Sequence, residues 1–182
     1  NSVEQFFWHD FCDNYLELIK NQFFKPELYS AHEITATRYV LDMVFLRILQ
    51  WYAPYIPHST EMIYQHLYKE RCLVQSIHQT KFSRIKSDYS YPQSVVAINY
   101  VLAIVSQIRK LKSDHQLSLK VELGQCTFFA NASCIESLRA LEQIIKGVTH
   151  AQVIVYAMHE SNSAESGLKK IDDVWHATVV VT

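Results

Sequence analysis

Apolar residues in the first part of the chain recur every three or four positions, which is the period of an amphipathic helix. Residues 2–24 show this pattern, with Ser2 and Gln5 spaced as a capping box and Pro26 just beyond the end. Five aromatic rings crowd the first fifteen residues, and a helical period puts Trp8 on the same face as Tyr15. We therefore predict that most of these rings belong to a buried core and do not form an open ligand site.

Three further helices are predicted by the same period. The second spans residues 31–53, between a capping box of Ser30 and Glu33 and a stop at Pro54. A short third helix covers 60–68, an irregular, basic and Ser-rich stretch follows over about 75–90, and a fourth helix runs from Pro92 to about residue 112. The residues that we predict to be largely buried are Trp8, Cys12, Tyr15, Leu41, Val44, Ile48 and Leu102.

The period changes after a bend at residues 113–118. Three segments alternate or are rich in β-branched residues, which predicts strands at 126–130, 151–157 and 176–182. A capped helix over 133–147, closed by Gly147, separates the first two, and residues 158–170 form a polar hairpin or loop. The predicted fold is therefore mostly α, with a helical bundle over residues 1–112 followed by a small α+β unit over residues 113–182.

Composition limits the chemistry that the chain can support. Its 182 residues are 49% hydrophobic, enough for a real core, and its 3 glycines leave no Gly-rich loop to cradle a nucleotide phosphate. The longest apolar run, "VVAINYVLAIV", is about half the length of a membrane span, so no membrane association is expected. The chain opens without a signal peptide or an initiator Met, which suggests an excised piece of a longer protein.

Cysteine and histidine spacing does not favour a metal site. The four cysteines are far apart and form no C-x-x-C pair, and the nine histidines include no H-E-x-x-H motif. Reduced core thiols of a cytoplasmic protein are the expected role for such cysteines. With no nucleophile placed beside a base either, the covered sequence is not expected to be an enzyme by itself.

Charge is distributed unevenly along the chain. Residues 1–70 carry a balance of −4, residues 71–120 one of +6, and residues 121–182 one of −3. The basic middle allows a localised contact with a phosphate backbone, although the whole chain is nearly neutral. The basic residues at 109, 110 and 112 have a competing explanation, because cations are also favoured at the C-terminus of a helix.

Several motifs resemble one family in combination. The segment "WHDFCDNYLELIK" from Trp8 strongly resembles the helix that opens the C-terminal, anticodon-binding region of class I aminoacyl-tRNA synthetases, in the valyl-tRNA synthetase version. "LRILQWYAPYIPHSTEMIYQHLY" from Leu46, "SIH" from Ser76 and "IRKLKSDHQLSL" from Ile108 keep the same order. The resemblance covers residues 2–130 well and the remainder weakly.

The resemblance implies a non-catalytic, tRNA-binding part of an ATP-dependent valine–tRNA ligase that acts in translation. ATP, Mg²⁺ and valine would belong to a catalytic domain elsewhere in the same chain, because neither a HIGH nor a KMSKS signature occurs here. The implied partner is the anticodon arm of a valine tRNA, whose single-stranded bases can stack on rings and be read at their edges.

The candidate phosphate contacts are six basic residues on or near the predicted helices: Lys20, Arg38, Arg109, Lys110, Lys112 and Lys120. Two alternatives stay open at this point. The chain could be the same domain of an isoleucyl-, leucyl- or methionyl-tRNA synthetase, or a helical protein-interaction module that binds no RNA.

Overall fold

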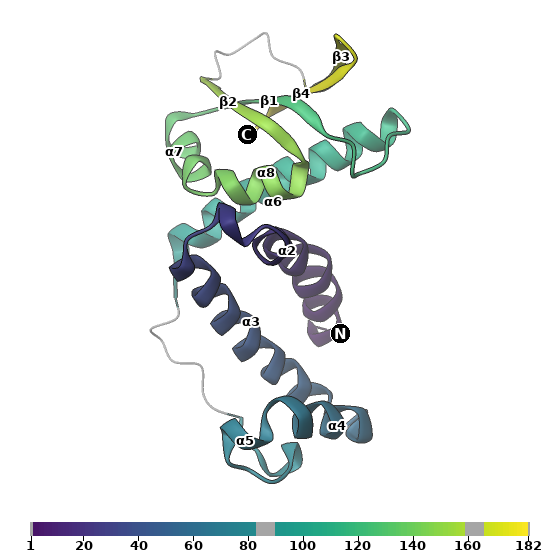
Figure 1. The fold of residues 1–182 in the computed structure, drawn as a ribbon, viewed down its shortest axis with the longest axis vertical. Helices are drawn as coiled ribbons and strands as arrows, with labels where there is room; N and C mark the ends of the chain where they lie inside the picture. Colours follow the sequence, from purple (N-terminus) through teal and green to yellow (C-terminus); the bar gives the residue numbers. More distant parts are fainter. Residues whose placement is uncertain (1, 83–89, 159–165, 182) are drawn as a thin grey trace. The chain divides into compact units, whose positions relative to one another are not determined.

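A computed structural model describes residues 2–82, 90–158 and 166–181 (Figure 1). The chain divides into two compact units, each built from two stretches of sequence. The first unit takes residues 1–13 and 29–90, and the second takes residues 14–28 and 91–182. These limits differ from the predicted boundary at residue 112, because the last predicted helix and part of the first one pack with the α+β portion.

The first unit is helical throughout its described secondary structure. It contains α1 (Ser2–Gln5), the start of a π-helix (Phe6–Leu16), α3 (Ala31–Tyr52), α4 (Pro57–Leu67), α5 (Lys69–Cys72) and a 3₁₀ turn (Ile77–Gln79). The capping box before α3 is confirmed: the backbone N–H of Ser30 donates to the Glu33 carboxylate at 2.8 Å, and that of Glu33 donates to the Ser30 hydroxyl at 3.2 Å. Residues 83–89 of the predicted basic stretch lie outside the described residues.

The core of this unit lies between α3, α4 and the 3₁₀ turn, and it consists of Leu49, Ala53, Tyr64, Tyr68 and Ile77. The hydroxyl groups of its two tyrosines are satisfied by backbone oxygens. Tyr64 donates to the carbonyl of Val74 at 2.9 Å and Tyr68 to that of Asp42 at 3.1 Å. Buried polar groups with such partners fix the path of the backbone as well as fill space.

The burial predicted for Trp8 is wrong. Its side chain is 61% exposed, whereas Phe11 on the same helix is only 5% exposed. Residues 6–16 are π-helical, and the wider turn of a π-helix changes which side chains share a face. Phe6 and Phe7 meet the rings of Trp51 and Tyr52 on α3 instead, with ring centroids 5.6 and 5.4 Å apart.

The other predicted core positions are mixed. Ile48 is buried as predicted, whereas five further residues are only partly buried: Cys12, Tyr15, Leu41, Val44 and Leu102. The period of a helix therefore identified the right side of α3 and α6 but overestimated how deeply each side chain lies.

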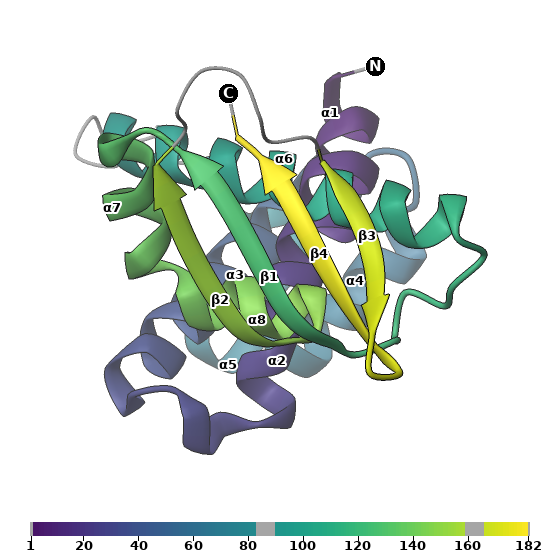
Figure 2. The ribbon, with the colours of Figure 1, turned by 90° about the horizontal axis from the view of Figure 1, so that it is seen from above.

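In its described residues, the second unit combines four α-helices with a four-stranded sheet (Figure 2). Its helices are α2 (Glu17–Phe24), α6 (Pro92–Asp114), α7 (Ala132–Ala140) and α8 (Glu142–Thr149), with a 3₁₀ turn at Pro26–Leu28. Its strands are β1 (Leu123–Ala130), β2 (Ala151–Met158), β3 (Gly167–Ile171) and β4 (Val174–Val180). By length and composition alone α6 could cross a membrane, a test that core helices of folded domains also pass.

The sheet has the order β2-β1-β4-β3. β1 runs parallel to both β2 and β4, and β3 is antiparallel to β4. α7 and α8 form the crossover from β1 to β2, and together with α6 they lie on one face of the sheet (Figure 2). The predicted mostly helical fold with a small α+β unit is thus confirmed.

Two local predictions in this unit need correction. The single helix predicted over 133–147 is two helices, and Gly147 lies inside α8 instead of closing it. A Cβ at Gly147 would come within 2.7–2.9 Å of the Asn21 side chain, so the glycine allows α2 and α8 to approach closely. The polar hairpin or loop predicted over 158–170 contains most of β3, which pairs antiparallel with β4, while residues 159–165 lie outside the described residues.

Candidate nucleic-acid interface

Four of the six predicted phosphate contacts line one groove in the second unit. The groove encloses about 210 Å³, and its walls come from α2, α6, the segment between α6 and β1, and the end of α8. We call it the basic groove. Its charged and titratable residues are Glu17, Lys20, Arg109, Lys112, Lys120 and His150.

Lys112 forms the floor of the basic groove and is only 1% exposed. Its ammonium group donates to three backbone carbonyls, those of Leu119 at 3.0 Å, Val121 at 2.7 Å and Thr149 at 3.0 Å. All three N–H donors are therefore used inside the protein. Removal of this charge from water lowers the pKa of Lys112.

This geometry removes Lys112 from the predicted phosphate contacts, because its donors are already occupied and its side chain has almost no surface. Lys112 instead ties the end of α6 to the segment before β1 and to the end of α8. No acid forms an ion pair with it among the described residues, so it adds an uncompensated positive charge beneath the groove.

Three of the groove's cations keep their charged groups near water. Lys120 is exposed and Arg109 is half-buried. Lys20 is exposed and forms an ion pair with Glu17, its ammonium lying 2.7 Å from the carboxylate. Such exposed pairs are weak, so a phosphate can compete with Glu17 for Lys20.

The other two predicted contacts lie elsewhere. Arg38 is exposed on α3, which belongs to the first unit. Lys110 is exposed on α6 but does not line the groove, although both of its neighbours do. The structure thus gathers Lys20, Arg109 and Lys120 and leaves Arg38 and Lys110 outside.

Sequence reasoning missed His150. This residue follows α8 in the left-handed conformation, with a φ of 59°, and its side chain is exposed where it lines the groove. The helix was predicted to end three residues earlier, at Gly147, so nothing marked His150 as a helix-end residue. A pattern of basic residues alone could not bring residues 20, 109, 120 and 150 together.

Two of the motifs that carried the family resemblance meet in the first unit. The Glu61 carboxylate accepts from the Ser76 hydroxyl at 2.9 Å and from the backbone N–H of Ile77 at 3.0 Å. Desolvation alone would raise the pKa of Glu61, but these bonds and one from Gln65 outweigh it and hold the pKa below its usual value. The "STE" and "SIH" motifs therefore form a structural clip between α4 and the 3₁₀ turn.

No metal centre is formed within residues 2–82, 90–158 and 166–181, where no group of three His, Cys, Asp or Glu side chains comes together. The buried thiol of Cys126 has its pKa raised to about 12 by desolvation, which disfavours the thiolate that metals and electrophiles need.

Comparison with known proteins identifies the family of the chain. Residues 1–126 match the family described as the anticodon-binding domain of tRNA ligase. The valine–tRNA ligase of Ehrlichia canis (strain Jake) is 31% identical over 170 residues, which are 93% of this chain and 20% of that protein. That of Rickettsia akari (strain Hartford) is 33% identical over 154 residues, 85% of this chain and 18% of that protein.

A third relative carries the same name. The valine–tRNA ligase of Pyrococcus furiosus is 28% identical over 147 residues, covering 81% of this chain and 16% of that protein. The chain therefore spans about one fifth of the length of these relatives. The family match over more than half of its residues shows that this chain belongs to the anticodon-binding domain family of tRNA ligases.

Proposed function

We propose that this chain binds the anticodon arm of a valine tRNA, as the non-catalytic part of a valine–tRNA ligase. The observation that carries the proposal is the basic groove, in which α2, α6 and the segment before β1 bring Lys20, Arg109 and Lys120 together. The family match supports a tRNA as the ligand, and the names of the relatives support valine as its amino acid.

The groove suits the backbone of the RNA and not its bases. Arg109 can hold two phosphate oxygens in a planar fork, while Lys20 and Lys120 act as point charges. Each cation that neutralises a phosphate releases counterions, so the logarithm of affinity should fall with the logarithm of salt by about 0.9 per contact in a duplex stem.

The bases need a different surface, and the exposed indole of Trp8 offers one in the first unit. Its ring meets Phe7 edge-on, with centroids 4.9 Å apart, while 61% of the side chain stays open. A base splayed from a loop can stack on such a ring for about 1–3 kcal/mol. Trp8 is therefore the proposed stacking residue, and quenching of its fluorescence by bound RNA would report the contact.

The whole ligase would use ATP and Mg²⁺ in the cytoplasm, with a catalytic domain in the same chain. The residues described here do not suit either group, since they gather no three acidic or histidine ligands and the chain has only 3 glycines. No catalytic step is therefore assigned to this portion. Its contribution is to hold the tRNA so that the acceptor end reaches a distant active site.

Binding of a valine tRNA transcript should be compared with binding of the same transcript carrying another anticodon. Preference for the valine anticodon supports the proposal, and equal binding refutes it and leaves a backbone contact only. A preference for an isoleucine, leucine or methionine tRNA would favour the corresponding ligase, and absence of any RNA binding would favour a protein-interaction module.

The groove has its own test. Replacing Arg109 and Lys120 by Ala should weaken binding of every transcript and reduce the salt slope by about two units, one for each lost contact. Lys110→Ala is the matched control, because this lysine is on the same helix as Arg109 but outside the groove. An unchanged salt slope in the folded double variant would remove the groove from the interface.

A further inference from the structure

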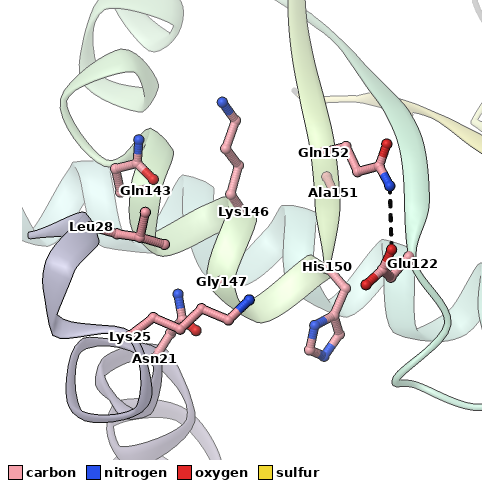
Figure 3. Close-up of a pocket in the computed structure, with 10 residues that line it drawn as sticks. All are labelled: Asn21, Lys25, Leu28, Glu122, Gln143, Lys146, Gly147, His150, Ala151 and Gln152. Atoms are coloured by element: carbon pink, nitrogen blue, oxygen red, sulfur yellow. Dashed lines mark hydrogen bonds between the residues drawn. The ribbon is translucent and has the colours of Figure 1, made fainter.

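A second pocket lies beside the basic groove in the same unit (Figure 3). It encloses about 330 Å³, and its polar residues come from α2 and the residue after it, from α8 and its end, from the segment before β1, and from the start of β2. Figure 3 shows Asn21 on α2, Lys25 just after α2, His150 at the end of α8, and Glu122 in the segment before β1. His150 lines both cavities, so this residue lies at their junction.

The backbone of His150 is fixed on both sides. Its N–H donates to the carbonyl of Lys146 at 2.9 Å, and its own carbonyl accepts from the N–H of Leu123 at 2.9 Å. The first bond ends α8 and the second joins the residue to the start of β1. The ring is thus carried by a rigid point of the fold and is itself exposed.

The surroundings of His150 are strongly cationic. Six lysines and arginines line the two cavities against two glutamates. From α2 and its end come Glu17, Lys20 and Lys25; from α6 come Arg109 and Lys112. The segment before β1 gives Lys120 and Glu122, and α8 gives Lys146, which forms an ion pair with Glu142 at 2.7 Å.

Partial burial and this field together favour the neutral form of the imidazole. Desolvation first and the charge of Lys112 second lower the pKa of His150, Glu122 opposes them, and Lys20 and Lys25 lower the pKa further. A negatively charged oxygen group that enters the junction would place a negative charge beside the imidazole, where most of the nearby charges are positive. The ring could then bind a proton from solvent and donate an N–H to that group.

We propose that the basic groove and the second pocket form one binding site for RNA backbone phosphates, and that His150 contacts a phosphate at their junction in its protonated form. The proposal rests on the proposed function and specifies where the RNA backbone lies on the second unit. It extends the interface to Lys25, which neither the sequence nor the basic groove assigned.

The consequence is a binding affinity that rises as pH falls. Proton uptake and RNA binding are linked, so each unit by which bound RNA raises the pKa of His150 increases affinity tenfold at acidic pH. We expect about a tenfold rise for a transcript between pH 7.5 and 5.5 at constant salt. His150→Asn should abolish this rise, since Asn tolerates the left-handed backbone and carries no titratable group.

His66→Asn is the matched control, because His66 is exposed on α4 in the first unit and should keep the full rise. Lys25→Gln tests the second pocket. It should lower the affinity for the valine transcript and for the anticodon-swapped transcript, and it should reduce the salt slope by about one. Circular dichroism would establish that each variant is folded.

The outcomes separate this proposal from the anticodon proposal. The role of His150 is overturned if the affinity of the wild-type protein does not rise as pH falls. It is also overturned if the affinity of His150→Asn still rises. An unchanged salt slope in Lys25→Gln overturns the inclusion of the pocket. Equal binding of valine and anticodon-swapped transcripts, each with a rise that needs His150, would refute anticodon selection and still support the phosphate site.

Discussion

Replacing Lys112 by Met should destabilise the second unit by about 3–4 kcal/mol. Methionine keeps the length of the side chain but removes the donor shared by three carbonyls. Thr149 is buried and Val121 half-buried, so their carbonyls lose a partner without ready access to water, at about 1–3 kcal/mol each. Leu119 is exposed, and its carbonyl can turn to solvent at little cost.

Part of this loss is recovered, because the variant no longer holds a charge away from water. The measurement is urea unfolding followed by Trp175, which lies in the second unit, in a background with Trp8 and Trp51 replaced by Phe. Lys110→Met is the control, since this exposed neighbour should change stability by no more than about 0.5 kcal/mol. A loss below about 1 kcal/mol for Lys112→Met, with an unchanged denaturant slope, would refute the reasoning.

Three further predictions test other parts of the fold. Gly147→Ala should destabilise the second unit by about 1–2 kcal/mol, because overpacking against the Cβ of Asn21 exceeds the gain in helix propensity; Gly167→Ala, which meets nothing within 4 Å, is the control in the same thermal scan. Glu61→Gln should reduce the acid sensitivity of the first unit. The lowered pKa of Glu61 gives stability that is present above about pH 4.5 and is lost as pH falls through the pKa of the folded state. Unfolding of the variant and the wild type should therefore be compared at pH 6 and 3. Phe11→Ala should cost about 3–5 kcal/mol and Trp8→Ala about 1 kcal/mol or less in denaturant titrations, and equal losses would contradict the exposure difference between them.

The helix limits were predictable because they depend on neighbours in sequence. The Ser30–Glu33 capping box and the stops at Pro26 and Pro54 act within one turn of the chain, and each works as the local chemistry requires. The π-helix at residues 6–16 was not predictable in this way, because the search for apolar residues assumed 3.6 residues per turn. Trp8 was therefore placed in the core, although its neighbours Phe6 and Phe7 make the contacts with α3.

Gly147 shows a second kind of limit. A glycine near the end of an apolar helical pattern most often follows the last turn, and that statistical rule predicted the end of the helix. Here the missing side chain is needed at a crossing with Asn21, a residue 126 positions earlier in the chain. Such a requirement exists only once α2 and α8 have come together, so the sequence around residue 147 does not contain it.

The basic groove was predictable in kind but not in the roles of its residues. Sequence reasoning selected cations near helix ends, and four of them do converge. Lys110 and Lys112 both lie near the end of α6, and their sequence positions do not show which one is exposed. Only the carbonyl acceptors at residues 119, 121 and 149 distinguish Lys112 from Lys110.

This difference decides how the interface should be tested by mutation. Lys112 shapes the basic groove, since it joins α6 to two of the segments that supply Lys120 and His150. Its substitution would weaken RNA binding even if no phosphate ever approached it, because the other contacts would lose their positions. A Lys112 variant should therefore lose affinity whether or not the groove contacts RNA, so this loss does not test the contact. Among the hydrogen bonds described, none made by the side chain of Arg109 or Lys120 joins two segments as those of Lys112 do. The salt slopes of their variants therefore measure contact with the RNA itself.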